Sequence, residues 1–438
     1  MNAKSIYAGD ASSIYATNTM FPKDIALQDD LKFDVAAPAG WEYAPGDTII
    51  GHLMRKSPLV TPECTVSVWL AGRVRTKIWR DKDSRYGPDV YGDHWNLFHG
   101  AQDVVHDGPL HHLENSDEPL SWPIAVQIPT LPSPSVGKGH IDATSFTSLE
   151  KPSPSLPGTF TAHGSDFPNR SEGVVEYAIN ARLNYIHRGA RRVFYTTLLI
   201  TLRHPLDSGA RLGETKECHI YHPLKIQSQR LLPGMEDVEL SLGQKTRKLF
   251  HSTKVPEFWY EITMGMPTAI QLNSSEPFPL VFTFLPRDDK TSGSIKNHPQ
   301  KIHIKWVNLR LHCTTAVMAA SNLRENYAQT DQQIYEVNLH LQKVFDELGT
   351  SLVISSTGKG NEPINLGNMF QLNLRSDGLY TAGKRLVRWP SINSIYPDFT
   401  AYGIKHTHSL EPSVSLSIAG EEKTVKFKPQ NLQIIGAA

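Results

Sequence analysis

Alternation of apolar and polar residues with a period of two is the feature that most constrains this sequence. Over residues 65–78 the valine, leucine and isoleucine side chains fall on one face, and the basic side chains fall on the other. Residues 173–183 repeat the pattern. A strand places successive side chains on opposite faces, whereas a helix would scatter both sets around its axis. The sequence therefore predicts long, half-buried strands.

Shorter segments of the same kind recur along the chain, separated by turn residues. Glycine and proline contribute 30 residues each, which suits a chain with many turns. Many short strands with few helices are typical of antiparallel sandwiches, so we expect an all-β fold. The further predicted strands are 31–35, 48–54, 122–128, 193–202, 259–264, 278–285, 302–313, 351–355, 370–374, 413–418, 423–428 and 432–435.

One segment follows a helical period instead. Between residues 320 and 348 the apolar residues step by seven, three, four, three and four. This stripe predicts a helix that covers part of a sheet, or alternatively one that binds a partner. Gly349 follows the stripe as a C-terminal stop. The stripe consists of Tyr327, Ile334, Val337, Leu341, Val344 and Leu348.

Three stretches interrupt the strand pattern. Residues 81–117 are rich in Asp, His, Gly and Tyr without a steady period, so we expect an irregular insertion there. Residues 130–157 are rich in Pro and Ser and predict a loop between strands. Residues 203–215 are the third break, and we place a domain boundary in them. The predicted domains are 1–204 and 205–438.

Charge and cysteine content exclude several classes of protein. Lysine plus arginine and aspartate plus glutamate are each 44 residues, so the net charge is zero and a grossly basic nucleic-acid binder is excluded. Cys64, Cys218 and Cys313 lie far apart without a CxxC pair, which argues against a zinc ribbon or a disulfide scaffold and favours a reducing compartment. No apolar stretch approaches the roughly 20 residues of a spanning helix, so we expect a soluble protein.

No catalytic signature is present in the sequence. It contains no GxSxG, HExxH, Walker or GxGxxG motif. We therefore expect a protein that is not an enzyme and has no cofactor. The histidines of the 81–117 segment have spacings that match no known zinc arrangement, so we expect a solvated loop rather than a metal site. They are His94, His99, His106, His111 and His112.

The first long strand carries a row of basic residues. Arg73, Arg75 and Lys77 alternate with apolar residues and project side by side, about 6.8 Å apart. Three cations at this spacing repel one another unless anions lie nearby. They either pair with carboxylates of a neighbouring strand or a domain interface, or form a surface for phosphorylated or acidic tails or anionic lipid.

A second basic cluster lies in the sequence His-Arg-Gly-Ala-Arg-Arg. Arg188, Arg191 and Arg192 fall at a predicted hairpin tip. Solvated loop charge is one interpretation and partner binding is the other, as for the first row of cations.

A tight turn precedes the strand at 48–54. Pro45 presets φ at the first central position of a type II turn, and Gly46 supplies positive φ at the second. Asp47 is placed to bond local backbone amides. Gly51 lies inside the next strand, which indicates a bulge or a close backbone approach. Tyr43 opens the motif.

This passage resembles the start of the arrestin N-terminal domain, in which a Tyr/Phe-x-Pro-Gly-Asp-x-Ile/Val-x-Gly stretch recurs. Residues 156–160 (Leu-Pro-Gly-Thr-Phe) and the strand at 173–183 are similar to the Leu-Pro-x-x-Phe loop and Tyr-x-Ile/Val-x-Ala strand of that family. Residues 397–421 resemble the last hairpin of the arrestin C-terminal domain. The resemblance is specific over about 31–203, weaker over 205–436, and strongest to fungal α-arrestins, the arrestin-related trafficking adaptors.

The resemblance implies two immunoglobulin-like β-sandwiches joined by a short hinge. The helical stripe at 320–348 then predicts a helical insertion in the second. It also implies a non-catalytic cytosolic adaptor, peripheral at the plasma membrane or endosome. Such adaptors bind cytoplasmic tails of membrane transporters or receptors, and many recruit a HECT-type ubiquitin ligase, so that the cargo is internalised. The alternative is a coat-like subunit of a stable complex, or an arrestin-fold scaffold that recruits no ligase. A β-sandwich enzyme is a third class.

The ligase-binding signature of that family is missing from this chain. Neither Pro-Pro-x-Tyr nor Leu-Pro-x-Tyr occurs in the sequence. A WW domain needs both the extended proline segment and the tyrosine for its second pocket. We therefore expect weak or no direct binding of a ligase WW domain to this chain.

Overall fold

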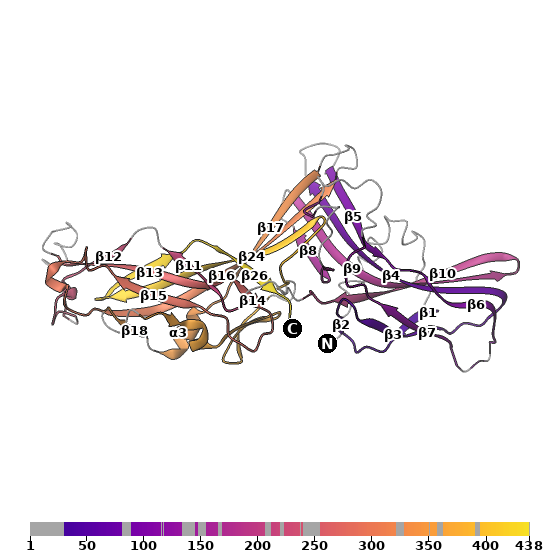
Figure 1. Cartoon of the computed structure of the whole chain (residues 1–438), viewed down its shortest axis with the longest axis horizontal. Helices are drawn as coiled ribbons and strands as arrows, with labels where there is room; N and C mark the ends of the chain where they lie inside the picture. Colours follow the sequence, from indigo (N-terminus) through magenta and orange to yellow (C-terminus); the bar gives the residue numbers. More distant parts are fainter. Residues whose placement is uncertain are drawn as a thin grey trace. The chain divides into compact units, whose positions relative to one another are not determined.

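The computed structural model of the chain consists mainly of β-strands, and the helices among its described residues are short (Figure 1). The expected all-β fold class is confirmed. The structure describes residues 30–80, 89–114, 116, 118–133, 145–147, 155–164, 169–205, 212–219, 223–236, 238–239, 255–320, 328–349, 351–356, 362–389 and 395–437.

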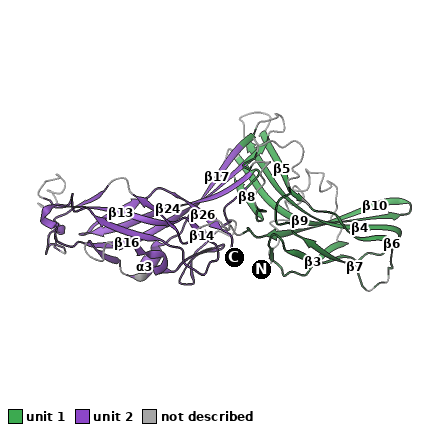
Figure 2. Ribbon diagram, viewed as in Figure 1, with its two compact units in different colours: residues 1–205, 318–329, 401–403 green, residues 206–317, 330–400, 404–438 purple. Residues whose placement is uncertain are grey.

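The chain divides into two compact units (Figure 2). The first contains the described residues up to Pro205, together with those of Met318–Gln329 and Ala401–Gly403. The second contains the remainder. The sequence places its single boundary after residue 204, whereas the structural division also returns two later segments to the first unit.

The first unit contains two sheets. The smaller sheet has the order β1-β3-β7. The larger has the order β2-β10-β9-β4-β5, with β6 paired to β4 and β8 paired to β9. The strands of the two sheets are β1 Leu31–Val35, β2 Glu42–Tyr43, β3 Thr48–Arg55, β4 Leu59–Arg80, β5 Asp89–His99, β6 Asp103–His112, β7 Leu120–Gln127, β8 Phe160–Gly164, β9 Asn169–His187 and β10 Ala190–Leu202.

Side chains from the two sheets of the first unit meet in its interior. The guanidinium of Arg55 on β3 lies 5.2 Å from the ring centre of Phe194 on β10 and 5.9 Å from that of Tyr185 on β9. These two rings stack in parallel at 5.7 Å. Arg55 is buried and also forms an ion pair of 2.9 Å with Asp30. A buried cation is tolerated here because it has both a carboxylate and aromatic faces as partners.

The second unit contains sheets of five, eight and three strands. Their orders are β11-β13-β15-β19 with β12 on β13, then β14-β26-β24-β16-β17 with β18, β23 and β25 attached, and β20-β21-β22. The strands are β11 Thr215–His219, β12 Leu224–Gln227, β13 Glu257–Pro267, β14 Ala269–Gln271, β15 Val281–Pro286, β16 Lys301–Ala320, β17 Ala328–Asn338, β18 Leu352–Ser355, β19 Ile364–Asn365, β20 Leu372–Arg375, β21 Gly378–Thr381, β22 Lys384–Arg388, β23 Phe399–Ala401, β24 Ile404–Ile418, β25 Glu421–Lys426 and β26 Gln430–Ile435.

One hydrophobic core joins the sheets of the second unit. It combines aromatic residues of β13 and β15, such as Tyr260 and Phe284, with aliphatic residues of β16 and β24, such as Leu309 and Val414. The rings of Tyr260 and Phe284 stack at 5.1 Å. Burying large apolar side chains from both sheets supplies the main favourable free energy for holding them together. The unit also contains the helices α3 Gln342–Leu348 and α4 Leu366–Phe370, and the 3-10 turns η2 Gln229–Leu231 and η3 Gly293–Ile295.

The long alternating segments are strands, as predicted. β4 pairs with β9 in antiparallel register from Cys64 opposite Tyr185 to Arg80 opposite Asn169. The two most regular patterns in the sequence are therefore hydrogen-bonded neighbours. Alternation identified them because one face of each strand is buried along most of its length.

The predicted helix over residues 320–348 is wrong for most of the residues that the structure describes in this range. β17 occupies Ala328–Asn338, and α3 is the only helix among those described residues. Ile334 and Val337 share a helical stripe, but in the strand Ile334 is 58% exposed and Val337 is 7% exposed. Pairing with β16 selects the period of two in this segment over the period of 3.6. Gly349 does end α3, with a left-handed φ of 65°.

The expectation of an irregular insertion at 81–117 is also wrong in the part that the structure describes. Both β5 and β6 pair with β4 in antiparallel fashion. Alternation of apolar and polar residues is weak in these two strands, because much of their surface is not buried. The sequence pattern therefore does not predict them. Most of the predicted loop at 130–157 lies outside the described residues.

Candidate functional site

The predicted turn before β3 is confirmed. Gly46 has a φ of 93°, and the backbone N–H of Asp47 donates to the carbonyl of Ala44 at 3.1 Å. The backbone N–H of Ala44 in turn donates to Asp47 Oδ2 at 2.7 Å. Tyr43 is buried in β2, opposite Leu202 of β10. The motif thus connects the beginning of β3 to the end of the larger sheet.

Gly51 provides the predicted close backbone approach. A Cβ atom at this position would collide with the carbonyl oxygen of Asp34 and would lie 2.7 Å from Cα of Val35. Gly51 is the register partner of Val35 in the β1–β3 pair. Only glycine fits here without moving β1, so the role of this residue is structural.

The basic row on β4 is paired within the protein. Arg73 forms an ion pair and hydrogen bond with Glu176 on β9, and Arg75 forms one of 2.7 Å with Glu172 on the same strand. All four side chains are at most 15% exposed. The ammonium of Lys77 lies 4.6 Å from the ring centre of Trp79. The sequence left two interpretations open, and for Arg73 and Arg75 the structure supports pairing with carboxylates of a neighbouring strand.

The second basic cluster lies at a hairpin tip, as predicted. His187 of β9 pairs with Ala190 of β10, so Arg188 and Gly189 form a two-residue turn. Both central residues have positive φ, 50° and 75°, which matches the twist of a hairpin. Arg188, Arg191 and Arg192 are all exposed. Within the described part of the chain, no carboxylate forms an ion pair with any of the three.

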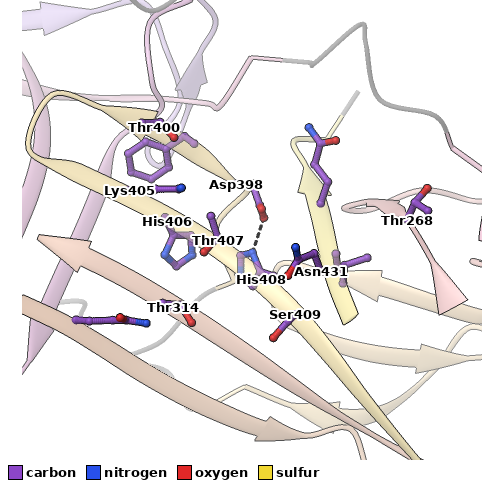
Figure 3. Close-up of a pocket in the computed structure, with 14 residues that line it drawn as sticks. Thr268, Thr314, Asp398, Thr400, Lys405, His406, Thr407, His408, Ser409 and Asn431 are labelled. Atoms are coloured by element: carbon purple, nitrogen blue, oxygen red, sulfur yellow. Dashed lines mark hydrogen bonds and ion pairs between the residues drawn. The ribbon is translucent and has the colours of Figure 1, made fainter. Parts of the chain in front are cut away.

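A polar pocket of about 760 Å³ lies in the second unit, beside β24 (Figure 3). Its size falls in the ordinary range of ligand sites, about 300–1,000 Å³. Most such sites are apolar, whereas this one is lined largely by hydroxyl, amide and charged side chains. The lining residues are Thr268, Thr314, Gln332, Asp398, Phe399, Thr400, Lys405, His406, Thr407, His408, Ser409, Asn431, Leu432 and Gln433.

An acid and a histidine form the most closely bonded pair in the pocket. Asp398, immediately before β23, accepts a hydrogen bond of 2.5 Å from Nδ1 of His408 on β24. It also accepts one of 3.0 Å from the backbone N–H of Ile434 on β26. The carboxylate fixes the histidine with its proton on Nδ1. The His408 side chain is fully buried, and its Nε2 atom has no hydrogen-bond partner in the part of the chain that is described.

Two further groups lie beside this pair on the buried face of the sheet. The ring of His406 meets that of His408 edge to face at 4.7 Å, and its Nδ1 atom lies 2.8 Å from the hydroxyl of Thr315. Cys313 on β16 is the register partner of His408 and shares its face. Burial, and then the charge of Asp398, raise the pKa of the Cys313 thiol to about 12.

Cys313, His408 and Asp398 are the residue types of a nucleophilic triad, but their chemistry is different. A cysteine attacks as the thiolate, and neighbouring positive charge normally lowers the pKa of a catalytic thiol. Here the thiol pKa is raised, so the thiol stays protonated at neutral pH. The arrangement supports a structural or binding role for these residues.

No protein-family model matches this chain, and no curated protein matches it. None of the helices among the described residues has the length and apolar character needed to cross a bilayer. Among those same residues, no group of three or more His, Cys, Asp or Glu side chains is arranged to hold a metal ion.

Sequence patterns alone did not reveal the pocket. Asp398 precedes a short strand, and His408 sits in an alternating segment in which a buried histidine has no distinguishing pattern. Their pairing depends on how β23 and β26 both attach to β24. One available signal was His406 and His408 on the apolar face of a strand, together with Leu410. Buried polar side chains need hydrogen-bond partners, so these two histidines could have indicated a buried polar site.

Proposed function

We propose that this protein is a non-catalytic cytosolic adaptor that binds acidic or phosphorylated cytoplasmic tails of membrane transporters or receptors. In this proposal each unit is an immunoglobulin-like β-sandwich of arrestin type. The protein acts peripherally at the plasma membrane or endosome, and promotes ubiquitin-dependent endocytosis and trafficking of its cargo. Recruitment of a HECT-type ligase would then use a surface other than a Pro-Pro-x-Tyr motif.

The observation that carries the proposal is the arginine cluster at the β9–β10 tip. Arg188, Arg191 and Arg192 are exposed, and none has an ion-pair partner among the described residues. Arginine binds carboxylate and phosphate oxygens with two parallel hydrogen bonds. By contrast, Arg73 and Arg75 are already occupied by glutamates. The tip is therefore the better candidate for an anionic partner.

Two structural features agree with this proposal. The turn at 43–51, whose sequence motif carries the family resemblance, has Gly46 at positive φ, as a type II turn requires. The thiol of Cys313, the nucleophile type beside His408, has a pKa of about 12, which disfavours covalent catalysis there.

A binding experiment with charge reversals tests the proposal. The variant Arg188→Glu, Arg191→Glu and Arg192→Glu should bind acidic or phosphorylated tail peptides at least tenfold more weakly than the wild type, a change of about 1.4 kcal/mol. Fluorescence anisotropy at two salt concentrations measures this, and wild-type binding should weaken with salt. A control that reverses the exposed Lys301, Lys423 and Lys426 makes the same change in charge and should leave binding intact.

Equal losses in the two triple variants would show that only net charge matters, and the tip would not be a specific site. Proximity labelling in cells of the native organism then tests the adaptor role. Transient labelling of membrane cargo and a ubiquitin ligase is the expected result. Stoichiometric, constant neighbours with no cargo would instead indicate a coat-like subunit.

A further inference from the structure

The outer face of β24 presents polar side chains whose hydrogen-bonding capacity is not used within the protein. Ser409 pairs in register with Asn431 of β26, and Thr407 pairs with Thr314 of β16. Register partners share a face, so these four side chains form two adjacent cross-strand pairs. Figure 3 shows them at the wall of the pocket. Within the described residues none of the four side chains makes a hydrogen bond.

Lys405 adds one positive charge to this wall. It lies two residues before Thr407 and therefore on the same face of β24. It is exposed, and it has no ion-pair partner within the described part of the chain. Thr400 of β23, another lining residue without a hydrogen bond among the described residues, lies at the same end of the pocket in Figure 3.

The acidic groups around the pocket already have hydrogen-bond or ion-pair partners. The carboxylate of Asp398 accepts hydrogen bonds from His408 and from the backbone N–H of Ile434. Further along the same face of β24, Glu411 contacts both His312 at 3.1 Å and Arg310 at 3.9 Å. Lys405 is therefore the lysine or arginine of the pocket lining that has no ion-pair partner among the described residues.

From this combination we infer that the pocket binds a polyhydroxylated ligand that carries a single carboxylate, the chemical class of the sugar acids. Hydroxyl groups both donate and accept hydrogen bonds, and the Thr, Ser and Asn side chains of the wall are complementary to them. The carboxylate pairs with the ammonium of Lys405 through a charge-assisted hydrogen bond. This inference does not rest on the proposed adaptor function, because it concerns another unit and another set of residues.

The charge and the polar groups of the pocket favour a sugar acid over a neutral sugar, a phosphate monoester or a simple carboxylate. A neutral sugar would leave Lys405 without an anion when the ligand excludes water from it. A dianion such as a phosphate monoester would bring a second negative charge that no unpaired cation balances, close to the carboxylate of Asp398. A simple carboxylate would leave the hydroxyl and amide groups of the wall unsatisfied.

Threonine methyl groups provide a direct probe, because Thr314, Thr400 and Thr407 line the pocket. The full chain, labelled with ¹³C at threonine methyl groups, is titrated with glucuronate, glucose, acetate and glucose 6-phosphate. We expect glucuronate to shift the resonances of these three methyl groups saturably. The other three compounds should bind at least tenfold more weakly.

Two variants and one control locate the contacts. Lys405→Gln should remove the preference for glucuronate over glucose. The pair Ser409→Ala and Asn431→Ala should weaken both ligands. Lys423→Gln, an exposed lysine on β25 of the same sheet, should change neither.

Three results would overturn the inference. They are the absence of saturable shifts with glucuronate at millimolar concentration, tighter binding of glucose 6-phosphate than of glucuronate, and an unchanged glucuronate affinity in Lys405→Gln. Because Lys405 is exposed, its substitution leaves the fold intact, and unaltered threonine spectra of the unliganded variant verify this.

Discussion

The carboxylate of Asp398 links the segment before β23 to two strands by accepting hydrogen bonds from His408 and Ile434. Nδ1 of His408 donates to it at 2.5 Å and the backbone N–H of Ile434 donates at 3.0 Å. Asp398 precedes β23, whereas its partners lie on β24 and β26. A single side chain thus joins a loop to two strands of the eight-stranded sheet.

Replacing this carboxylate should destabilise the second unit. Asp398→Asn removes the charged acceptor of a fully buried imidazole, and hydrogen bonds to charged groups contribute about 1.5–3 kcal/mol. We expect the free energy of unfolding in urea to fall by about this amount. Asp377→Asn is the control, because that carboxylate is half-exposed in its pair with Arg385 and should cost no more than about 1 kcal/mol. Equal costs for the two variants would contradict the role given to Asp398.

Close backbone packing at Gly51 should make this position intolerant of any side chain. Gly51→Ala places a methyl group against the carbonyl of Asp34, so β1 must move and the thermal midpoint should fall. Gly92→Ala on β5 is the matched control, since its Cβ would meet only the carbonyl oxygen of Thr76 at 3.8 Å. An unchanged midpoint in Gly51→Ala would show that β1 is not held in this register.

The turn before β3 should depend on its glycine for a different reason. Gly46→Val forces a β-branched residue to a φ of 93°, and such strain costs about 1–3 kcal/mol. Chemical denaturation should detect the loss in the first unit. If the variant were as stable as the wild type, the left-handed conformation at this position would not be needed.

Loss of the buried ion pair between Arg73 on β4 and Glu176 on β9 should destabilise the first unit. Arg73→Met leaves the carboxylate of Glu176 buried without its cation, and breaking a buried pair costs about 3–5 kcal/mol. A second change, Glu176→Leu, should restore much of the lost stability, because it removes the buried carboxylate that has no cation. A double-mutant cycle measures the coupling between the two residues. Additive effects would mean that the pair contributes nothing as a pair.

A buried histidine should make stability depend on pH. Burial lowers the pKa of His204 to about 4, from an ordinary value of 6.5. Between these values the unfolded chain binds a proton that the folded chain does not, so stability is complete above pH 6.5 and is lost as the pH falls toward 4. The Nδ1 atom also accepts a hydrogen bond from the backbone N–H of Gly158 at 3.3 Å, which only an unprotonated nitrogen can do.

Comparison with a glutamine variant isolates this contribution. Between pH 7 and pH 5 the wild type should lose about 2 kcal/mol more of its unfolding free energy than His204→Gln. Urea denaturation at both pH values measures the difference. His111→Gln, a change at an exposed histidine, should retain the wild-type pH dependence. Parallel pH profiles for His204→Gln and the wild type would refute the effect.

The sequence by itself determined the strands in which one face is buried along most of its length. β4 and β9 were predictable because their buried faces force strict alternation between apolar and polar residues. The turn at Gly46 and the close approach at Gly51 were also predictable, because each needs a residue without a Cβ atom. These are local requirements that one segment of chain expresses alone.

Tertiary structure decided the remaining features, because they depend on which segments become neighbours. β17 is a strand because β16 offers it an edge, although its apolar residues also fit a helical stripe. Arg73 and Arg75 became internal once β9 placed Glu176 and Glu172 against them. Asp398 meets His408 only because β23 and β26 attach to the same strand, and nothing in the spacing of two residues along a chain specifies the register in which distant strands pair.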